Sequence, residues 1–324
     1  MKMNSSNIMF MMVLTMSVIM SMSSNNFMTT WISMEINLIT FMPMMKKSNK
    51  MNEQSMKYLI IQSVASSIMM ASMIINSIIN HPINESIMMM SGVLTKVGMM
   101  PFHLWLPMTM QMMSWKMCMM MMTLQKIIPT MMTTQMTNIK MMIMPMMMSM
   151  MMGPIVGMKQ TSMKKLMAYS SITNSPIMIV SLHTSKQQFI MFFTMYSMIN
   201  IMMMKLMESN NILFLNQMNS QTSMTKMSMM ISAFSMSGMP PTTGFLIKWM
   251  IMKSSMEMSI IIPMMMISSS VMSTFMYLNM FLPSMTKSTE SKMKYKNKKM
   301  KKESIMVMTM NTMGIPMMML TNLN

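Results

Sequence analysis

The chain carries too little charge to cover the surface of a soluble protein. Its 324 residues include no arginine and no aspartate, and only 10% are charged, against roughly 25% in an average soluble domain. Cysteine is almost absent, and the single Cys118 excludes a domain stapled by internal disulfides. Hydrophobic residues make up 52% of the chain, which excludes a disordered protein. The composition therefore indicates an integral membrane protein.

Apolar runs of membrane-spanning length recur along the chain. A helix needs ~20 mostly apolar residues to cross a hydrocarbon core roughly 30 Å thick, whereas a barrel strand needs only ~10. The runs therefore predict an all-α polytopic protein that forms a single membrane domain over residues 1–324. The first run is expected to be a mature helix rather than a signal peptide, because no small-residue cleavage site follows it. The eleven predicted spans cover residues 4–23, 26–45, 57–79, 86–107, 112–134, 139–157, 165–184, 187–207, 223–250, 256–283 and 304–322.

The net charge of +18 comes from lysine alone. If eleven spans alternate in direction, fifteen loop lysines lie on the side of the N-terminus and three lie on the other. Positive loops remain on the side from which a membrane protein is inserted, so we expect the N-terminus inside and the C-terminus outside. A basic protein can also bind nucleic acid, but lysines placed between apolar spans favour the membrane interpretation, without a nucleic-acid partner.

The segment 285–303 is the longest polar stretch and contains eight of these lysines. We expect it to be a solvated loop on the inner side that fixes the orientation and contacts anionic lipid headgroups. The alternative is a surface that binds a partner protein.

Methionine accounts for 82 residues. Thioether sulfur can bind copper(I), but such a site requires clustered methionines, and here methionine replaces leucine and isoleucine throughout. A genome that reads AUA as methionine, as in animal mitochondria, explains the composition better. We therefore expect a mitochondrially encoded protein without a metal site.

Four ionisable residues are predicted to lie well inside the membrane: Glu35 in the second span, Lys96 in the fourth, Lys126 in the fifth and Lys248 in the ninth. A charge at this depth is costly, so it normally faces the protein interior and has a function. Such groups can take up and release protons. The alternatives are lysines that extend to the interface, or a static ion pair.

Helix-breaking residues accompany two of these lysines. Gly98 and Pro101 follow Lys96, and a Gly-Met-Pro-Pro run at 238–241 precedes Lys248. Irregular backbone inside a membrane is tolerated where it faces protein or water, so broken helices are typical of transport pathways. The pattern predicts two discontinuous helices. His103, just after the first break, is a candidate proton relay, with a structural hydrogen bond as the alternative.

Several stretches, taken together, resemble one known family. They are WISMEINLITFMP at 31–43, KVGMMPFHLWLP at 96–107, LQKIIP at 124–129, KKLMAYSSIT at 164–173 and GMPPTTGFLIKW at 238–249. In this order and spacing they resemble the antiporter-like subunit 2 family of mitochondrial NADH–ubiquinone oxidoreductase, respiratory complex I. The likeness extends over nearly the whole chain.

The resemblance implies a core membrane-arm subunit that couples electron transfer from NADH to ubiquinone to proton translocation across the mitochondrial inner membrane. It implies that Glu35 and Lys96 form an acid–lysine pair, that Lys126 lies on the central axis and that Lys248 serves the distal channel. It also implies partners among the other complex I subunits, and a matrix location for the N-terminus with the C-terminus in the intermembrane space. NADH, flavin, iron–sulfur clusters and ubiquinone would bind in other subunits; the chain itself has no glycine-rich dinucleotide motif and no Cys-x-x-Cys pair.

The chain departs from the family pattern in two places. Met108 stands where the family usually has glutamate, and Asn174, Ser175 and Pro176 stand where it has histidine followed by glycine and tryptophan. Two other functions remain as alternatives: a stand-alone cation–proton antiporter of related fold, and a purely structural membrane subunit.

Overall fold

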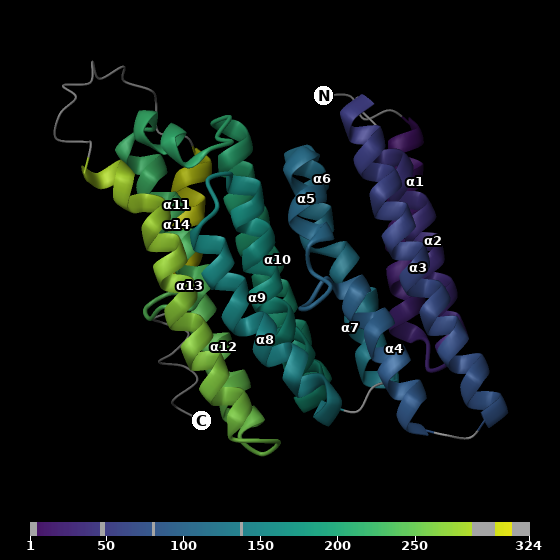
Figure 1. Ribbon diagram of the computed structural model, residues 1–324. Coiled ribbons are helices and arrows are strands. Elements are labelled where there is room, and N and C mark those ends of the chain that lie inside the picture. Colours follow the sequence, from purple (N-terminus) through teal and green to yellow (C-terminus); the bar gives the residue numbers. More distant parts are fainter. Residues whose placement is uncertain (1–4, 46–48, 80–81, 137–138, 287–301, 313–324) are drawn as a thin grey trace. The chain divides into compact units, whose positions relative to one another are not determined.

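The computed structural model describes residues 5–45, 49–79, 82–136, 139–286 and 302–312, and these are almost entirely helical (Figure 1). Within them the exceptions to α-helix are short connections, one 3-10 helix η1 (Leu215–Ser220) and an isolated bridge between Ser162 and Phe214. The helices form two compact units, Met1–Ser149 and Met150–Asn324.

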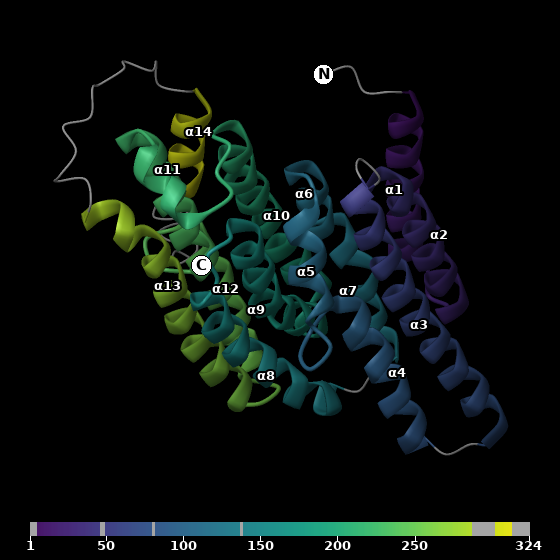
Figure 2. The same ribbon diagram turned by 45° about the horizontal axis from the view of Figure 1, so that its top comes forward.

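The first unit is built from neighbouring antiparallel helices. The early helices pack in chain order, α1 on α2, α2 on α3 and α3 on α4, and α7 contacts α1, α2 and α4 (Figures 1 and 2). This arrangement makes α7 the helix that joins the others. The helices are α1 (Ser5–Ser23), α2 (Phe27–Met45), α3 (Asn49–Ile79), α4 (Pro82–Val97), α5 (Trp105–Met112), α6 (Trp115–Met122), α7 (Leu124–Met136) and the first half of α8 (Ile139–Met158).

In the second unit, α9, α11 and α12 each pack against several other helices. Helix α9 contacts α10, α12 and α13, while α11 contacts α10, α12, α13 and α14. The helices are the rest of α8, α9 (Met163–Thr184), α10 (Lys186–Ser209), α11 (Ser223–Ser237), α12 (Thr243–Ser255), α13 (Ile261–Thr286) and α14 (Lys302–Thr312).

The connections of the second unit reach two opposite ends. At one end, which we call the Thr161 end, the Leu215 N–H donates to the Thr161 carbonyl at 3.1 Å and ties the segment after α8 to the segment after α10. At the other, the Gln188 end, Ser254 Oγ donates to Gln188 Oε1 at 2.8 Å and joins the end of α12 to the start of α10. Helices α9 and α10 therefore run in opposite directions between the two ends.

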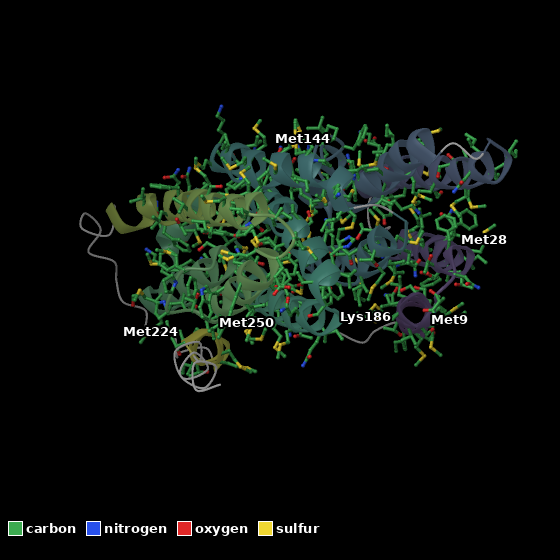
Figure 3. The ribbon with its side chains drawn as sticks, turned by 90° about the horizontal axis from the view of Figure 1, so that it is seen from below. Met9, Met28, Met144, Lys186, Met224 and Met250 are labelled. Atoms are coloured by element: carbon green, nitrogen blue, oxygen red, sulfur yellow. The ribbon has the colours of Figure 1, made fainter. Side chains whose placement is uncertain are left out.

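Helices of membrane-spanning length and apolarity are present in both units. Among the described residues five qualify: Ser5–Ser23, Glu53–Asn76, Ile139–Met158, Lys186–Ser209 and Ile261–Leu282. Large apolar side chains are exposed along them, and Figure 3 shows the exposed Met9 at the margin of the first unit. This exposure suits a lipid-facing surface. The number of eleven spans stays a prediction, and residues 287–301 of the lysine-rich segment lie outside the described residues, as do residues 313–322 of the last predicted span.

Two of the predicted spans are broken where the sequence indicated. A glycine in the left-handed conformation follows the last residue of α4 and of α11: Gly98 has φ 75° and Gly238 has φ 82°. In each case the glycine N–H and the next N–H donate to one carbonyl of the preceding turn, that of Leu94 or Phe234, at 2.9 to 3.1 Å. Glycine is the residue that adopts this conformation without strain, so the same sequence element ends both helices.

The fifth predicted span has a break that the sequence did not indicate. Residues 112–134 were expected to form one helix, but α6 ends at Met122 and α7 begins at Leu124, with Thr123 between them at φ −113° and ψ −85°. The Thr123 hydroxyl donates to the Met119 carbonyl at 2.8 Å. A side chain that bonds the preceding turn competes with the helical ladder, and no glycine or proline marks the site.

Helix α9 buries its polar residues. Five polar residues within a six-residue stretch weaken its hydropathy, yet α9 is continuous through Pro176 and all five are buried: Ser170, Ser171, Thr173, Asn174 and Ser175. Each hydroxyl donates to the backbone one turn earlier, so polarity is satisfied within the helix. The low hydropathy of this segment does not prevent it from forming a helix, because the helix is surrounded by protein rather than lipid.

The methionines are spread through the described part of the chain. Figure 3 shows their sulfur atoms, in yellow, over both units without a single gathering point. Some accept hydrogen bonds, as Met132 Sδ does from Thr30 Oγ1 at 2.7 Å. Methionine therefore acts here mainly as an apolar filler of irregular spaces.

We predict that Gly244→Ala destabilises the second unit. A Cβ at Gly244 would lie 1.7 Å from the Ser235 carbonyl oxygen, and backbone of α11 cannot rotate away. The overpacking should cost about 3 kcal/mol. The measurement is the fraction of protein that stays folded in detergent on heating. In the control Gly157→Ala, the new Cβ would meet the flexible end of Met276, so a smaller loss is expected; equal losses would contradict the prediction.

Candidate functional site

An ion pair joins α2 to α4 in the first unit. Lys96 Nζ lies 3.3 Å from Glu35 Oε1, with the lysine side chain 3% exposed and the glutamate 24% exposed. It is the one ion pair among the described residues. Glu35 lies in the middle of α2, whereas Lys96 lies in the last turn of α4, just before the break. The lysine is thus enclosed by protein, while the glutamate reaches the surface of the unit.

A cavity of about 30 Å³ opens beside this pair. Its lining brings Lys96 and Lys126 to one space, together with the polar side chains of Asn37, Tyr58 and Gln125. A water needs ~10–15 Å³ and two or more polar partners, so the cavity has room and partners for about two waters. The two lysines predicted from separate spans therefore share one hydratable space.

An amide contact fixes the wall of this cavity. Gln125 Nε2 donates to Asn37 Oδ1 at 2.7 Å, and the Tyr58 hydroxyl donates to Gln125 Oε1 at 3.4 Å. Gln125 immediately precedes Lys126, and Asn37 lies two residues after Glu35. Sequence reasoning missed these neutral residues because an amide inside an apolar span gives no charge signal.

Lys126 binds the open end of the first broken helix. Its Nζ donates to the carbonyl of Val97, the last residue of α4, and the side chain is buried. The Thr95 carbonyl in the same turn accepts from Trp105 Nε1 at 2.9 Å. A helix end leaves such carbonyls without partners, and here a lysine and an indole provide the donors.

Lys248 does the same at the second broken helix. Its Nζ donates to the carbonyls of Met236 and Ser237, the last two residues of α11, at 3.0 Å each. The lysine lies on α12, just beyond the break, and is buried. The negative end of a helix dipole favours a cation at this position.

The second lysine also borders a cavity. A space of about 20 Å³ is lined by Lys248, Gly244, Met236, Asn174 and Tyr196, among others. It is large enough for one water. Asn174 thus lies on the wall of this space, and its Nδ2 donates to the Ser170 carbonyl at 2.9 Å.

The lysine that binds the carbonyls at the first helix break is not the one that the sequence indicated. The sequence associated the first break with Lys96, the nearest lysine along the chain. In the structure Lys96 turns to Glu35, and the break is capped by Lys126 from α7. Among the described residues neither Lys126 nor Lys248 has a carboxylate within ion-pair distance.

His103 lies in the connection between α4 and α5. Its Nδ1 is 3.2 Å from the Pro101 carbonyl, and it does not line the cavity shared by Lys96 and Lys126. Its role as a proton relay stays a prediction. The three lysines Lys96, Lys126 and Lys248, in contrast, are buried beside water-sized spaces, which is what stepwise proton transfer requires.

Comparison with known proteins gives a consistent result. Residues 24–276 match the family described as NADH:quinone oxidoreductase/Mrp antiporter, TM. The chain is 34% identical to NADH-ubiquinone oxidoreductase chain 2 of Locusta migratoria over 78% of both chains. It is 32% identical to the Artemia franciscana protein of that name, over 91% of this chain and 94% of the relative. In structure it resembles a chain of respiratory complex I from Thermus thermophilus, with TM-score 0.79 and 15% identity over 88% of this chain and 71% of that one.

Proposed function

Because the chain belongs to the NADH-ubiquinone oxidoreductase chain 2 family, it is a multi-pass membrane subunit of the proton-translocating NADH dehydrogenase of the mitochondrial inner membrane. We propose that protons move through this subunit by way of Glu35, Lys96, Lys126 and Lys248. The other complex I subunits are its partners. We also propose that NADH oxidation and ubiquinone reduction take place in those other subunits, since this sequence has no dinucleotide motif and no cluster of cysteines.

The observation that carries the proposal is the Glu35–Lys96 pair beside the cavity that reaches Lys126. At 3.3 Å and an effective dielectric constant of about 20, the attraction is about 5 kcal/mol. An energy of this size changes a protonation equilibrium by more than three powers of ten. Opening the pair would therefore change whether Lys96 holds or releases its proton, and the released proton would enter the water space next to Lys126.

The partial exposure of Glu35 suits a signal from outside the unit. A charge that approaches the 24% exposed carboxylate would compete with Lys96 for it. In this mechanism Glu35 receives the signal and Lys96 responds with its proton. The alternative is a permanent ion pair that only holds α2 against α4.

The second unit supplies a matching proton site. Lys248 is held at the end of α11 by two carbonyls and borders a water-sized space. Lysine, unlike arginine, can lose its proton in a protein. A lysine held by backbone carbonyls alone keeps its position while its charge changes, because carbonyls accept hydrogen bonds from the amine as well.

A stand-alone antiporter is the other candidate activity, since the family description includes Mrp antiporters. The relatives at 30% identity and above carry the name of the oxidoreductase chain, which favours the oxidoreductase subunit. A purely structural subunit would not need lysines beside hydratable cavities.

We predict that Lys248→Met lowers proton pumping by the assembled complex more than it lowers the amount of complex. Lys248→Arg provides a second test, because it keeps donors for the Met236 and Ser237 carbonyls but cannot release a proton; it should assemble better than Lys248→Met and still pump poorly. Pumping is measured in proteoliposomes as protons moved per NADH oxidised. Lys253→Met, at an exposed position on the same helix, is the control. Normal pumping by assembled Lys248 variants would refute the role.

We predict that Glu35→Gln yields an assembled complex with impaired pumping, because glutamine keeps the shape but removes the charge that stabilises Lys96. The exposed Glu53 of α3 provides the matched control Glu53→Gln, which should pump normally. If the pair is only structural, Glu35→Gln should either disturb assembly or have no effect, and either outcome would contradict the switching mechanism.

We propose that the N-terminus lies in the matrix and the C-terminus in the intermembrane space. The lysine count along the chain supports this orientation. The second unit agrees with it, since Lys159, Lys164 and Lys165 lie near the Thr161 end, while Lys186 and Lys253 lie near the Gln188 end.

The orientation predicts which cysteines can be labelled in mitoplasts with a membrane-impermeant maleimide. A Ser288→Cys variant, in the lysine-rich segment, should stay unlabelled until the inner membrane is permeabilised. A Lys186→Cys variant, at an exposed position of the Gln188 end, should be labelled without permeabilisation. The reverse pattern would place the N-terminus in the intermembrane space.

A further inference from the structure

Two polar contacts with the same spacing on both helices join α2 to α7 in the first unit. Near the start of α2, the Thr30 hydroxyl donates to Met132 Sδ at 2.7 Å and lies 3.2 Å from Gln135 Oε1. Seven residues later on α2, Asn37 Oδ1 accepts from Gln125 Nε2 at 2.7 Å, and Gln125 lies seven residues before Met132 on α7. Seven residues are about two helical turns. The two antiparallel helices are therefore attached at two points, about two turns apart.

This attachment hinders α2 from sliding or rotating against α7. The two contacts lie about 10 Å apart along each helix axis, so a rotation about one of them would break the other. A third contact, from Gln135 Nε2 to the Ser24 carbonyl at 3.1 Å, holds the end of α7 to the connection before α2. Helices α2 and α7 thus form one body, which we call the α2–α7 body. We call the bond between Asn37 and Gln125 the amide bridge.

Helix α4 makes polar contacts with the α2–α7 body through two consecutive residues at its end. Lys96 Nζ lies 3.3 Å from Glu35 Oε1 of α2, and the carbonyl of Val97 accepts from Lys126 Nζ of α7. Glu35 lies two residues before one amide of the bridge, and Lys126 directly follows the other. The amide bridge therefore joins the two helix segments that hold the end of α4.

The amide bridge links the two contacts of α4 mechanically. If the end of α4 moves against the α2–α7 body, the two groups that hold it stay fixed relative to each other, so both contacts lengthen together. If the bridge breaks, α2 and α7 can separate, and each contact can open alone. Asn37 is 3% exposed, and a buried amide that loses its partner is costly. The bridge is therefore expected to persist while α4 moves.

We propose that Asn37 and Gln125 are positioning residues that make the two contacts of α4 open and close together. The inference rests on the proposed function of Lys96 and Lys126 in proton transfer. In one movement of α4, Lys96 loses its carboxylate as Lys126 loses its carbonyl, and both side chains line the same cavity. The amides themselves neither take up nor release a proton, so they act only through the position of the two helices.

The first test follows both contacts of α4 in the unmodified complex by cryo-electron microscopy, at rest and during NADH oxidation, with separation of conformational classes. In every class the two amide side chains should stay within hydrogen-bonding distance. The ion pair and the Lys126 contact should be both closed or both open, and classes of both kinds should occur. A class with one contact open and the other closed would overturn the inference, and so would a single state of both contacts in all classes.

The second test changes the reach of each amide and keeps its polarity. Asn37→Gln lengthens the bridge by one methylene and Gln125→Asn shortens it, so each single variant should misplace α2 against α7. Each should lower the protons moved per NADH oxidised in proteoliposomes by about twofold to fivefold, the effect expected from one hydrogen bond. NADH oxidation should be unchanged when the gradient is collapsed. The double variant Asn37→Gln/Gln125→Asn restores the length of the bridge and should pump better than either single variant.

This exchange separates positioning from hydration and from packing. Every variant keeps two amides in the cavity wall, so a role in binding water alone predicts normal pumping by both single variants. A purely structural role predicts less assembled complex but normal pumping per complex. The control is Gln54→Asn, the same change in a half-buried glutamine of α3 that does not line the cavity. Single variants that pump like this control, or a double variant that pumps no better than they do, would overturn the inference.

The proposed function and this inference can fail separately. Normal pumping by Glu35→Gln would refute the role of the ion pair, while the classes of the unmodified complex would still show whether the two contacts move together. If Glu35→Gln pumps poorly while the single amide variants match Gln54→Asn, the role of the ion pair stands and the amides are not positioning residues. The first test needs no variant, so it decides the question even where an amide variant does not assemble.

Discussion

The hydrogen bond between a lysine and the last carbonyls of a broken helix is the interaction on which both units depend. A helix that stops inside an apolar medium leaves carbonyls without donors, and no bulk water is available to bind them. Lys126 and Lys248 provide those donors, and the negative end of the helix dipole in turn favours their charge. The break and the lysine therefore stabilise each other, and the ionisable group is held where the backbone opens to a water-sized space.

The two units meet this requirement with different connectivity. In the second, the chain runs from the break directly into the helix that carries Lys248, so a short local segment closes the site. In the first, the capping lysine comes from α7, while Lys96 beside the break pairs with Glu35 of α2. Three helices thus meet at one break. A displacement of α2 relative to α4 would act directly on the ion pair, which makes Glu35 the natural point of entry for a signal.

The sequence predicts much of this arrangement, but it does not predict which group each charged side chain contacts. The Gly-Met-x-Pro pattern predicted both breaks, and the burial cost of charge identified Glu35, Lys96, Lys126 and Lys248. A buried charge predicts that a residue needs a partner. It does not predict which carbonyl or carboxylate lies nearest in the folded chain. The break at Thr123 depends on a side-chain hydrogen bond, and threonine occurs in many unbroken helices.

The distribution of charged and neutral polar groups has a physical logic. Charged residues store protons but are costly to bury, so the described interior contains few of them, each with a carboxylate or carbonyl partner. Neutral amides and hydroxyls line the spaces between, where they hold water without creating a fixed charge that would trap a proton. Arginine would fill the same carbonyl contacts but could not release its proton, and additional carboxylates would bind the lysines permanently. An interior of isolated lysines, one paired glutamate and neutral polar walls is therefore suited to moving protons rather than to holding helices together.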